Sequence, residues 1–226
     1  LDTVGSSAHA SAIWQSPAMA SVLPSDRLSI GIQLPIQSKS TTFVEPWEAD
    51  AGAAELAAVA RAADAAGLAY VAVCDHVAVP ADHAATMGTE WWDTVATLGW
   101  LAGITERVRL LSHVYVPAYR HPLQVAKAFS TLDVVSGGRV VLGVGVGSLE
   151  EEFDLLGASF ADRGERADES LAAIRAAWGR SEPTFAGAHV AKREREGILV
   201  RSVSNLAMQK RRCACVLECT FSGMQR

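Results

Sequence analysis

An acid and an imidazole follow a short apolar segment in the first half of the 226-residue chain. Asp75 and His76 come directly after residues 68–74 (LAYVAVC), a run typical of a buried parallel strand. At the end of a strand, such a pair can bind a ligand and move a proton. The other interpretation is that Asp75 caps a turn and His76 is only partly exposed. We interpret Cys74 as a small core residue rather than a nucleophile.

A second polar group lies in and after residues 107–116 (RVRLLSHVYV), which have the pattern of a strand. Arg120 and His121 follow in a loop bracketed by prolines. Arg120 can hold a phosphate or carboxylate of a ligand, or pair with a carboxylate of the protein. The pattern favours neither. His121 precedes a proline at an expected helix start, so we predict a structural role for it.

A glycine-rich turn, Gly145-Val146-Gly147-Ser148, follows residues 139–144 (RVVLGV). It departs from the GxGxxG dinucleotide fingerprint. Three consecutive glutamates, residues 150–152, would also repel a pyrophosphate placed there. A Rossmann-type site is therefore not expected. The glycines can let a flat ring approach the backbone, or can simply make a tight turn between a strand and a helix.

Strand-like and helix-like patterns alternate between these groups and predict four consecutive βα units. The units form a parallel sheet, either an open doubly wound sheet or the first half of a (β/α)₈ barrel. Ligands bind at the carboxyl ends of the strands in both. Gly67 has the position of a helix C-cap glycine, and Ser148 with Glu151 has capping-box spacing for a short helix through Leu156. The strands are expected at 27–34, 68–74, 107–116 and 139–144, and the longer helices at 48–66, 92–104, 123–135 and 165–178.

Composition excludes several classes of protein. Hydrophobic residues make up 50% of the chain and charged residues 20%, as in a globular protein. There is no uninterrupted apolar run of membrane-spanning length, and the net charge of −5 disfavours a nucleic-acid binder. We therefore expect a cytoplasmic protein that binds neither a membrane nor a nucleic acid. Four cysteines make no disulfide framework, and the spacings of His76 with His83 and of the C-terminal cysteines predict no metal site.

The two ends differ in character from the central part. Residues 1–26 are rich in Ser and Ala and are interpreted as an N-terminal extension, native or not. Residues 27–185 form the barrel portion. Residues 186–226 form an atypical basic, cysteine-containing tail, in which 197–203 is the one candidate strand.

Residues 27–182 resemble the luciferase-like monooxygenase superfamily, especially its branch that uses the deazaflavin coenzyme F420. The resemblance rests on ordered segments that include residues 55–80 (ELAAVARAADAAGLAYVAVCDHVAVP) and 119–147 (YRHPLQVAKAFSTLDVVSGGRVVLGVGVG), the latter being the most specific. It implies an α/β fold of the (β/α)₈ TIM-barrel type. A complete barrel takes about 250 residues, so we expect one truncated to about the first four βα units.

The resemblance also implies a site. His76 is the expected catalytic proton donor or orienter, and His113–Val114 falls where the family often has a non-prolyl cis peptide against the ring. Ser148 stands where the sugar-phosphate dehydrogenase branch has an acidic catalytic residue, which disfavours that substrate. The residues expected to bind the cofactor are Asp75, His113, Val114, Val116, Gly145, Val146, Gly147, Ser148 and Glu151.

The function expected from the resemblance is hydride transfer between F420 and an unknown small organic substrate by a homodimeric oxidoreductase. One alternative is an FMN-dependent monooxygenase. The other is a truncated, inactive remnant that acts only by self-association, because an open half-barrel would expose a strand edge and apolar surface.

Overall fold

A parallel β-sheet forms the centre of the computed structural model, which describes residues 23, 26–41, 44–179, 187–189 and 215–216. Within these residues the strand order is β1-β2-β3-β4-β5, and every pairing between neighbours is parallel. The α/β class and the parallel sheet expected from the sequence are confirmed. The strands are β1 (Ile32–Gln33), β2 (Tyr70–Val73), β3 (Arg109–Ser112), β4 (Val140–Gly143) and β5 (Cys215–Val216).

Each of the four predicted strands, β1 to β4, is shorter than its hydrophobic pattern predicted. The difference is largest for β1, which pairs with β2 over only Ile32 and Gln33 of the expected range 27–34. Leu28 and Ile30, which precede it, are 85% and 60% exposed. β1 lies at one edge of the described sheet, so its residues have a hydrogen-bonding neighbour on one side only. Apolar alternation therefore overestimated its length.

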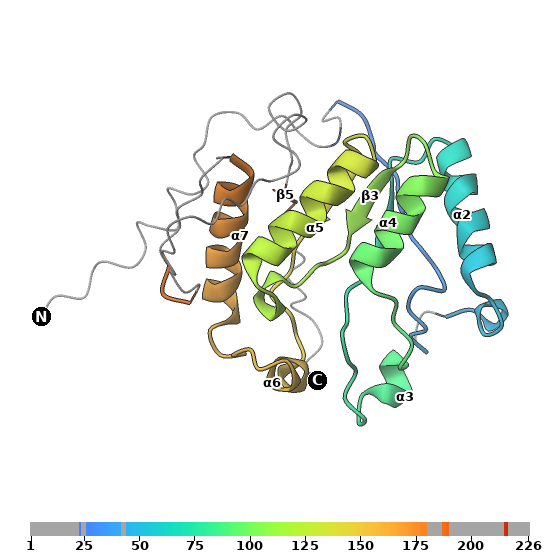
Figure 1. Cartoon of the computed structure of the whole chain (residues 1–226). Helices are drawn as coiled ribbons and strands as arrows, with labels where there is room; N and C mark the ends of the chain where they lie inside the picture. The colour runs from blue at the N-terminus through green and yellow to red at the C-terminus, as the bar shows by residue number, and fades with distance from the viewer. Residues whose placement is uncertain (1–22, 24–25, 42–43, 180–186, 190–214, 217–226) are drawn as a thin grey trace, which may run out of the picture.

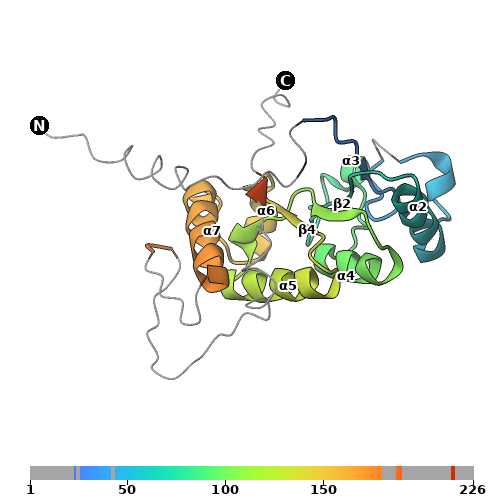
Figure 2. The ribbon, with the colours of Figure 1, turned by 90° about the horizontal axis from the view of Figure 1, so that it is seen from above.

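The long helices lie side by side along the sheet (Figures 1 and 2). α2 packs against α4, α4 against α5, and α5 against α7. Gly67, just after α2, has a φ of 76°, as expected for a C-cap glycine. Their bounds are α2 (Ala53–Ala65), α4 (Thr94–Ile104), α5 (Pro122–Val135) and α7 (Arg163–Gly179). None of the described helices has the length and apolar character needed to cross a membrane.

The hydrophobic core lies between these helices and the sheet. The core residues are those expected from the sequence patterns, because the apolar stripe of each helix faces strands that are mostly apolar. Large apolar helix residues with less than 2% exposure include Leu56, Leu98, Leu101, Phe129 and Ile174, and the apolar strand residues below the same exposure include Val71, Val73, Leu110 and Leu142.

Short elements occupy the connections: η1 (Pro46–Glu48), α3 (Ala84–Met87), η2 (Pro117–Tyr119) and α6 (Glu150–Leu155). The predicted capping box of α6 is wrong. Its N-cap is Leu149, with no side-chain cap, because Leu149 stays extended and is 9% exposed, so the helix begins one residue later. His121 does have the predicted structural role: it is the N-cap of α5, and its Nδ1 accepts a hydrogen bond from the Leu123 N–H.

The sequence did not predict α3 or the strand β5, which pairs with β4, nor the short helices η1 and η2. β5 falls within the tail that carried no strand signal at these positions. The candidate strand at 197–203 lies outside the described residues.

Candidate functional site

The loops that follow β2, β3 and β4 meet at the carboxyl ends of the strands. Figure 1 shows α3 and α6, which belong to the first and last of these loops, at the same end of the molecule below α4 and α5. Three polar side chains from the three loops meet there: His76 after β2, Tyr119 in η2 and Glu152 in α6.

Glu152 is the centre of this group. Its side chain is fully buried, and each of its oxygens accepts two hydrogen bonds. Oε1 accepts from the backbone N–H groups of Val77 at 2.6 Å and Ala78 at 3.1 Å. Oε2 accepts from the Tyr119 hydroxyl at 2.7 Å and lies 3.0 Å from Nδ1 of His76. A buried carboxylate with all its acceptor positions filled is satisfied in its charged form.

The charge state follows from these contacts. Burial opposes ionisation of Glu152, but the hydrogen bonds from His76, Tyr119 and the two backbone N–H groups outweigh it and lower its pKa to about 2. Burial and the adjacent carboxylate raise the pKa of Tyr119 above its usual range. Glu152 is therefore ionised and accepts, while Tyr119 stays protonated and donates.

His76 is held on a second side by an aromatic ring. The ring of Trp91 meets it edge-on, with centroids 4.5 Å apart. The indole Nε1 of Trp91 is buried and has no hydrogen-bond partner within the described chain. A buried donor without an acceptor is costly, and a ligand oxygen is one group that can satisfy it.

Asp75 lies in the wall of the site rather than on its surface, with a side chain only 2% exposed. Arg120 binds both of its oxygens, and the hydroxyl of Thr94 and the N–H of Val116 donate to it as well. Of the two partners that the sequence left open for Arg120, the structure thus shows a protein carboxylate. Val116, itself buried, contributes its backbone to the same group.

The loop after β3 packs on the glycine turn after β4. The His113–Val114 peptide bond is cis, as the resemblance implies. Val114 lies so close to Gly145 that a Cβ there would be 3.3 Å from the Val114 Cβ and closer still to Cγ2. Position 145 therefore requires a glycine, because any side chain there would collide with Val114.

The rest of the turn leads to the Glu152 group. Gly147 has a φ of 83°, and a Cβ on it would meet the ring of Phe153 at 2.6 Å and the Tyr119 hydroxyl at 3.2 Å. Val146 is 46% exposed and Ser148 is also exposed, so both present their side chains outward. His113 is exposed as well. The cofactor roles of these residues remain predictions.

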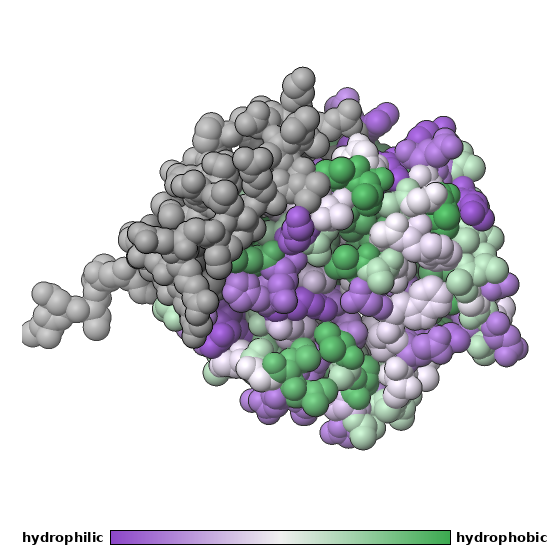
Figure 3. All heavy atoms as spheres, viewed as in Figure 1, coloured by the Kyte–Doolittle hydropathy of each residue, from purple (hydrophilic) through white to green (hydrophobic). Residues whose placement is uncertain are grey.

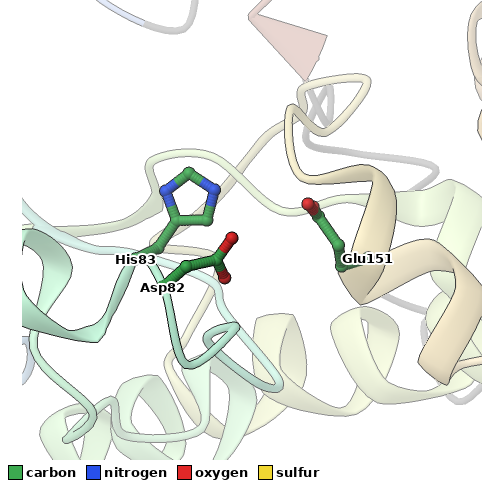
Figure 4. A group of neighbouring side chains, drawn as sticks. All are labelled: Asp82, His83 and Glu151. Carbon is green, nitrogen blue, oxygen red and sulfur yellow. The ribbon is translucent and has the colours of Figure 1, made fainter.

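Glu151 lies apart from the buried group. It is exposed on α6 and faces Asp82 and His83 of the loop before α3 (Figure 4). One ligand-type atom from each of the three lies within 4.8 Å of the others. Spacing along the chain did not predict this group. Two of its members are exposed carboxylates, so we assign no metal to it.

Sequence reasoning missed Glu152, Tyr119 and Trp91. One signal for Glu152 was present: Leu149, Glu152 and Phe153 have the i, i+3, i+4 spacing of one helix face, and all three are buried. A glutamate on an otherwise apolar face needs internal partners. Nothing in the sequence identified those partners.

The chain belongs to the luciferase-like monooxygenase family, whose family model matches residues 30–205. The match extends beyond residue 182, where we expected the resemblance to end. A curated relative, the F420-dependent glucose-6-phosphate dehydrogenase of Amycolatopsis mediterranei, is 34% identical over 143 residues, which are 60% of this chain and 41% of the relative.

Two solved structures share the fold. Monooxygenase RslO1 from Streptomyces bottropensis is 27% identical with a TM-score of 0.55, covering 70% of this chain and 46% of its own. The oxygenating constituent of 3,6-diketocamphane monooxygenase from Pseudomonas putida, in complex with FMN, is 17% identical with a TM-score of 0.55, covering 70% and 41%. The chain therefore spans less than half the length of each of these proteins.

Proposed function

We propose that the chain acts in an oxidoreductase that transfers a hydride between coenzyme F420 and a small organic substrate. The observation that carries the proposal is the pairing of His76 Nδ1 with the buried, ionised Glu152 at the carboxyl end of β2. This pairing leaves Nε2 of His76 as the nitrogen available to a substrate. The 34% identity to an F420-dependent dehydrogenase supports the choice of cofactor.

The residues at the strand ends fit a bound ring system. His76, the unpartnered indole N–H of Trp91, the His113–Val114 segment and the Gly145–Gly147 turn would hold it. When bound, the deazaflavin supplies a carbon that accepts or donates a hydride. His76 then moves the accompanying proton: when a substrate alcohol loses a hydride to the ring, its hydroxyl proton passes to Nε2.

The substrate is proposed to differ from a sugar phosphate. Ser148, an exposed hydroxyl, stands where the resemblance places an acid in the sugar-phosphate branch. The second candidate function is monooxygenation with FMN as the cofactor, and the 27% identity to monooxygenase RslO1 favours the monooxygenase part of this alternative.

Parallel titrations test the cofactor. The purified 226-residue chain is titrated with F420 and with FMN, and cofactor fluorescence is followed while circular dichroism verifies the fold. We expect saturable binding of F420 at lower concentration than FMN. Preferential binding of FMN would support the monooxygenase alternative, and binding of neither by a folded sample would contradict both.

A further inference from the structure

We propose that Glu152 is a positioning residue that sets the tautomer of His76, so that Nδ1 carries the hydrogen and Nε2 is the atom that takes up a substrate proton. This inference deepens the proposed function and rests on it for the role of His76. It concerns a buried group to which the sequence assigned no role.

The hydrogen bonds of Glu152 determine which ring nitrogen of His76 carries the hydrogen. An ionised carboxylate can only accept hydrogen bonds. Both oxygens are engaged by donors, and its buried side chain has no access to water. The 3.0 Å contact between Oε2 and His76 Nδ1 therefore requires a hydrogen on Nδ1. In a neutral imidazole the other nitrogen, Nε2, then has a free lone pair.

Glu152 and Trp91 also hold the His76 ring in one orientation. Oε1 of Glu152 is bound by the N–H groups of Val77 and Ala78, the two residues that follow His76. Glu152 thus binds the backbone beyond His76 as well as the imidazole ring. Trp91 packs edge-on against that ring. The ring is consequently held by a carboxylate and an aromatic side chain, as a base in a nucleophile–base–acid triad is held by its third member.

The same geometry predicts what an amide would do at this position. In Glu152→Gln the side-chain oxygen must face the two backbone N–H groups, because neither can change from donor to acceptor. The amide NH₂ must then occupy the place of Oε2 and donate toward His76 Nδ1. Nδ1 becomes an acceptor, and the hydrogen of the neutral ring moves to Nε2. The variant thus changes the tautomer while the shape of the side chain is kept.

Nitrogen NMR of the cofactor-free chain tests the proposal without any assay of activity. Histidine is labelled with ¹⁵N and spectra are recorded at about pH 8.5, well above the ordinary histidine pKa of about 6.5. His76→Asn identifies the His76 signals among those of the six histidines. We expect the Nδ1–H tautomer in the native chain and the Nε2–H tautomer in Glu152→Gln. The matched control Glu150→Gln, at an exposed position of the same helix, should keep the native tautomer.

Tyr119→Phe separates the two side chains that donate to Oε2. It removes the Tyr119 hydroxyl but leaves the carboxylate, so we expect the Nδ1–H tautomer to persist. The proposal is overturned if the native chain has the Nε2–H tautomer, or if Glu152→Gln leaves a folded chain with Nδ1–H. Titration of the same samples with F420 tests the proposed function separately, because the tautomer is read without cofactor.

Discussion

Arg120 binds Asp75 through two parallel hydrogen bonds, Nη1 to Oδ2 and Nη2 to Oδ1, each 2.7 Å long. The pair joins the loop after β3 to the end of β2, directly beside His76. The guanidinium also lies 4.1 Å from the centroid of the Tyr115 ring. The two residues are almost enclosed, with side chains 19% and 2% exposed. A charge left alone there would have no water to replace its partner.

Arg120→Ala should therefore destabilise the chain by about 3–5 kcal/mol, because it leaves a buried carboxylate without its cation. Urea unfolding measures the loss. Arg61→Ala, on the exposed face of α2, should stay within about 0.5 kcal/mol of the native chain. Equal stability of the two variants would show that the ion pair contributes nothing.

Glu152 should make stability depend on acid pH. Its folded pKa is about 2, below the reference of 4.5, so its contribution is present above about pH 4.5 and is lost as pH falls toward 2. The shift corresponds to about 3 kcal/mol, at roughly 1.4 kcal/mol per pKa unit. Urea unfolding at a series of pH values between 6 and about 2.5 should show this acid-dependent loss in the native chain. Glu150→Gln should retain the full loss, whereas Glu152→Gln should show a smaller one, because Asp64 and Asp162 also have lowered pKa values and keep their part. A native acid slope in Glu152→Gln would contradict the assignment.

Gly145→Ala should displace the loop that carries the cis peptide, because the new methyl meets Val114. Overpacking of this kind costs about 1–3 kcal/mol, and we expect weaker F420 binding with it. Gly99→Ala is the control: it lies inside α4 with nothing within 4 Å of the new Cβ. That change should stabilise the chain by about 0.5–1 kcal/mol. Thermal unfolding and cofactor fluorescence report the two effects.

His76→Ala should reduce turnover far more than it weakens cofactor binding, because its proposed task is proton transfer. General acid–base groups contribute typically 10²–10⁴-fold. The comparison needs kcat and the F420 dissociation constant of the same preparation. Unchanged turnover would remove His76 from the mechanism.

Self-association is predicted from the exposed apolar surface. Figure 3 shows separate hydrophobic patches on the face that carries the helices. Val135 on α5 is 61% exposed and Leu155 on α6 is 69% exposed. Light scattering should give twice the 23.9 kDa mass of the chain. A monomer would contradict the expected homodimer, and polydisperse aggregates would support the interpretation as an inactive remnant.

Periodicity predicted the helices well because each buries a continuous apolar stripe, and the C-cap at Gly67 is a local property of the backbone. The β1 strand was overestimated, since its ladder depends on a neighbour distant in the sequence. The prediction of a cis peptide bond between His113 and Val114 came from the family resemblance. No local pattern distinguishes that peptide.

The amino-acid sequence by itself determined the order of the βα units, because that order follows from hydrophobic periodicity. It also determined the family, because the resemblance rests on ordered local segments. Only the tertiary structure decided which side chains pair. Glu151 and Glu152 are neighbours of the same type, yet one faces the exposed pair Asp82 and His83 while the other is buried against His76. That difference depends on the rotation of α6 relative to the loop after β2. The rotation is set by packing between segments more than 70 residues apart.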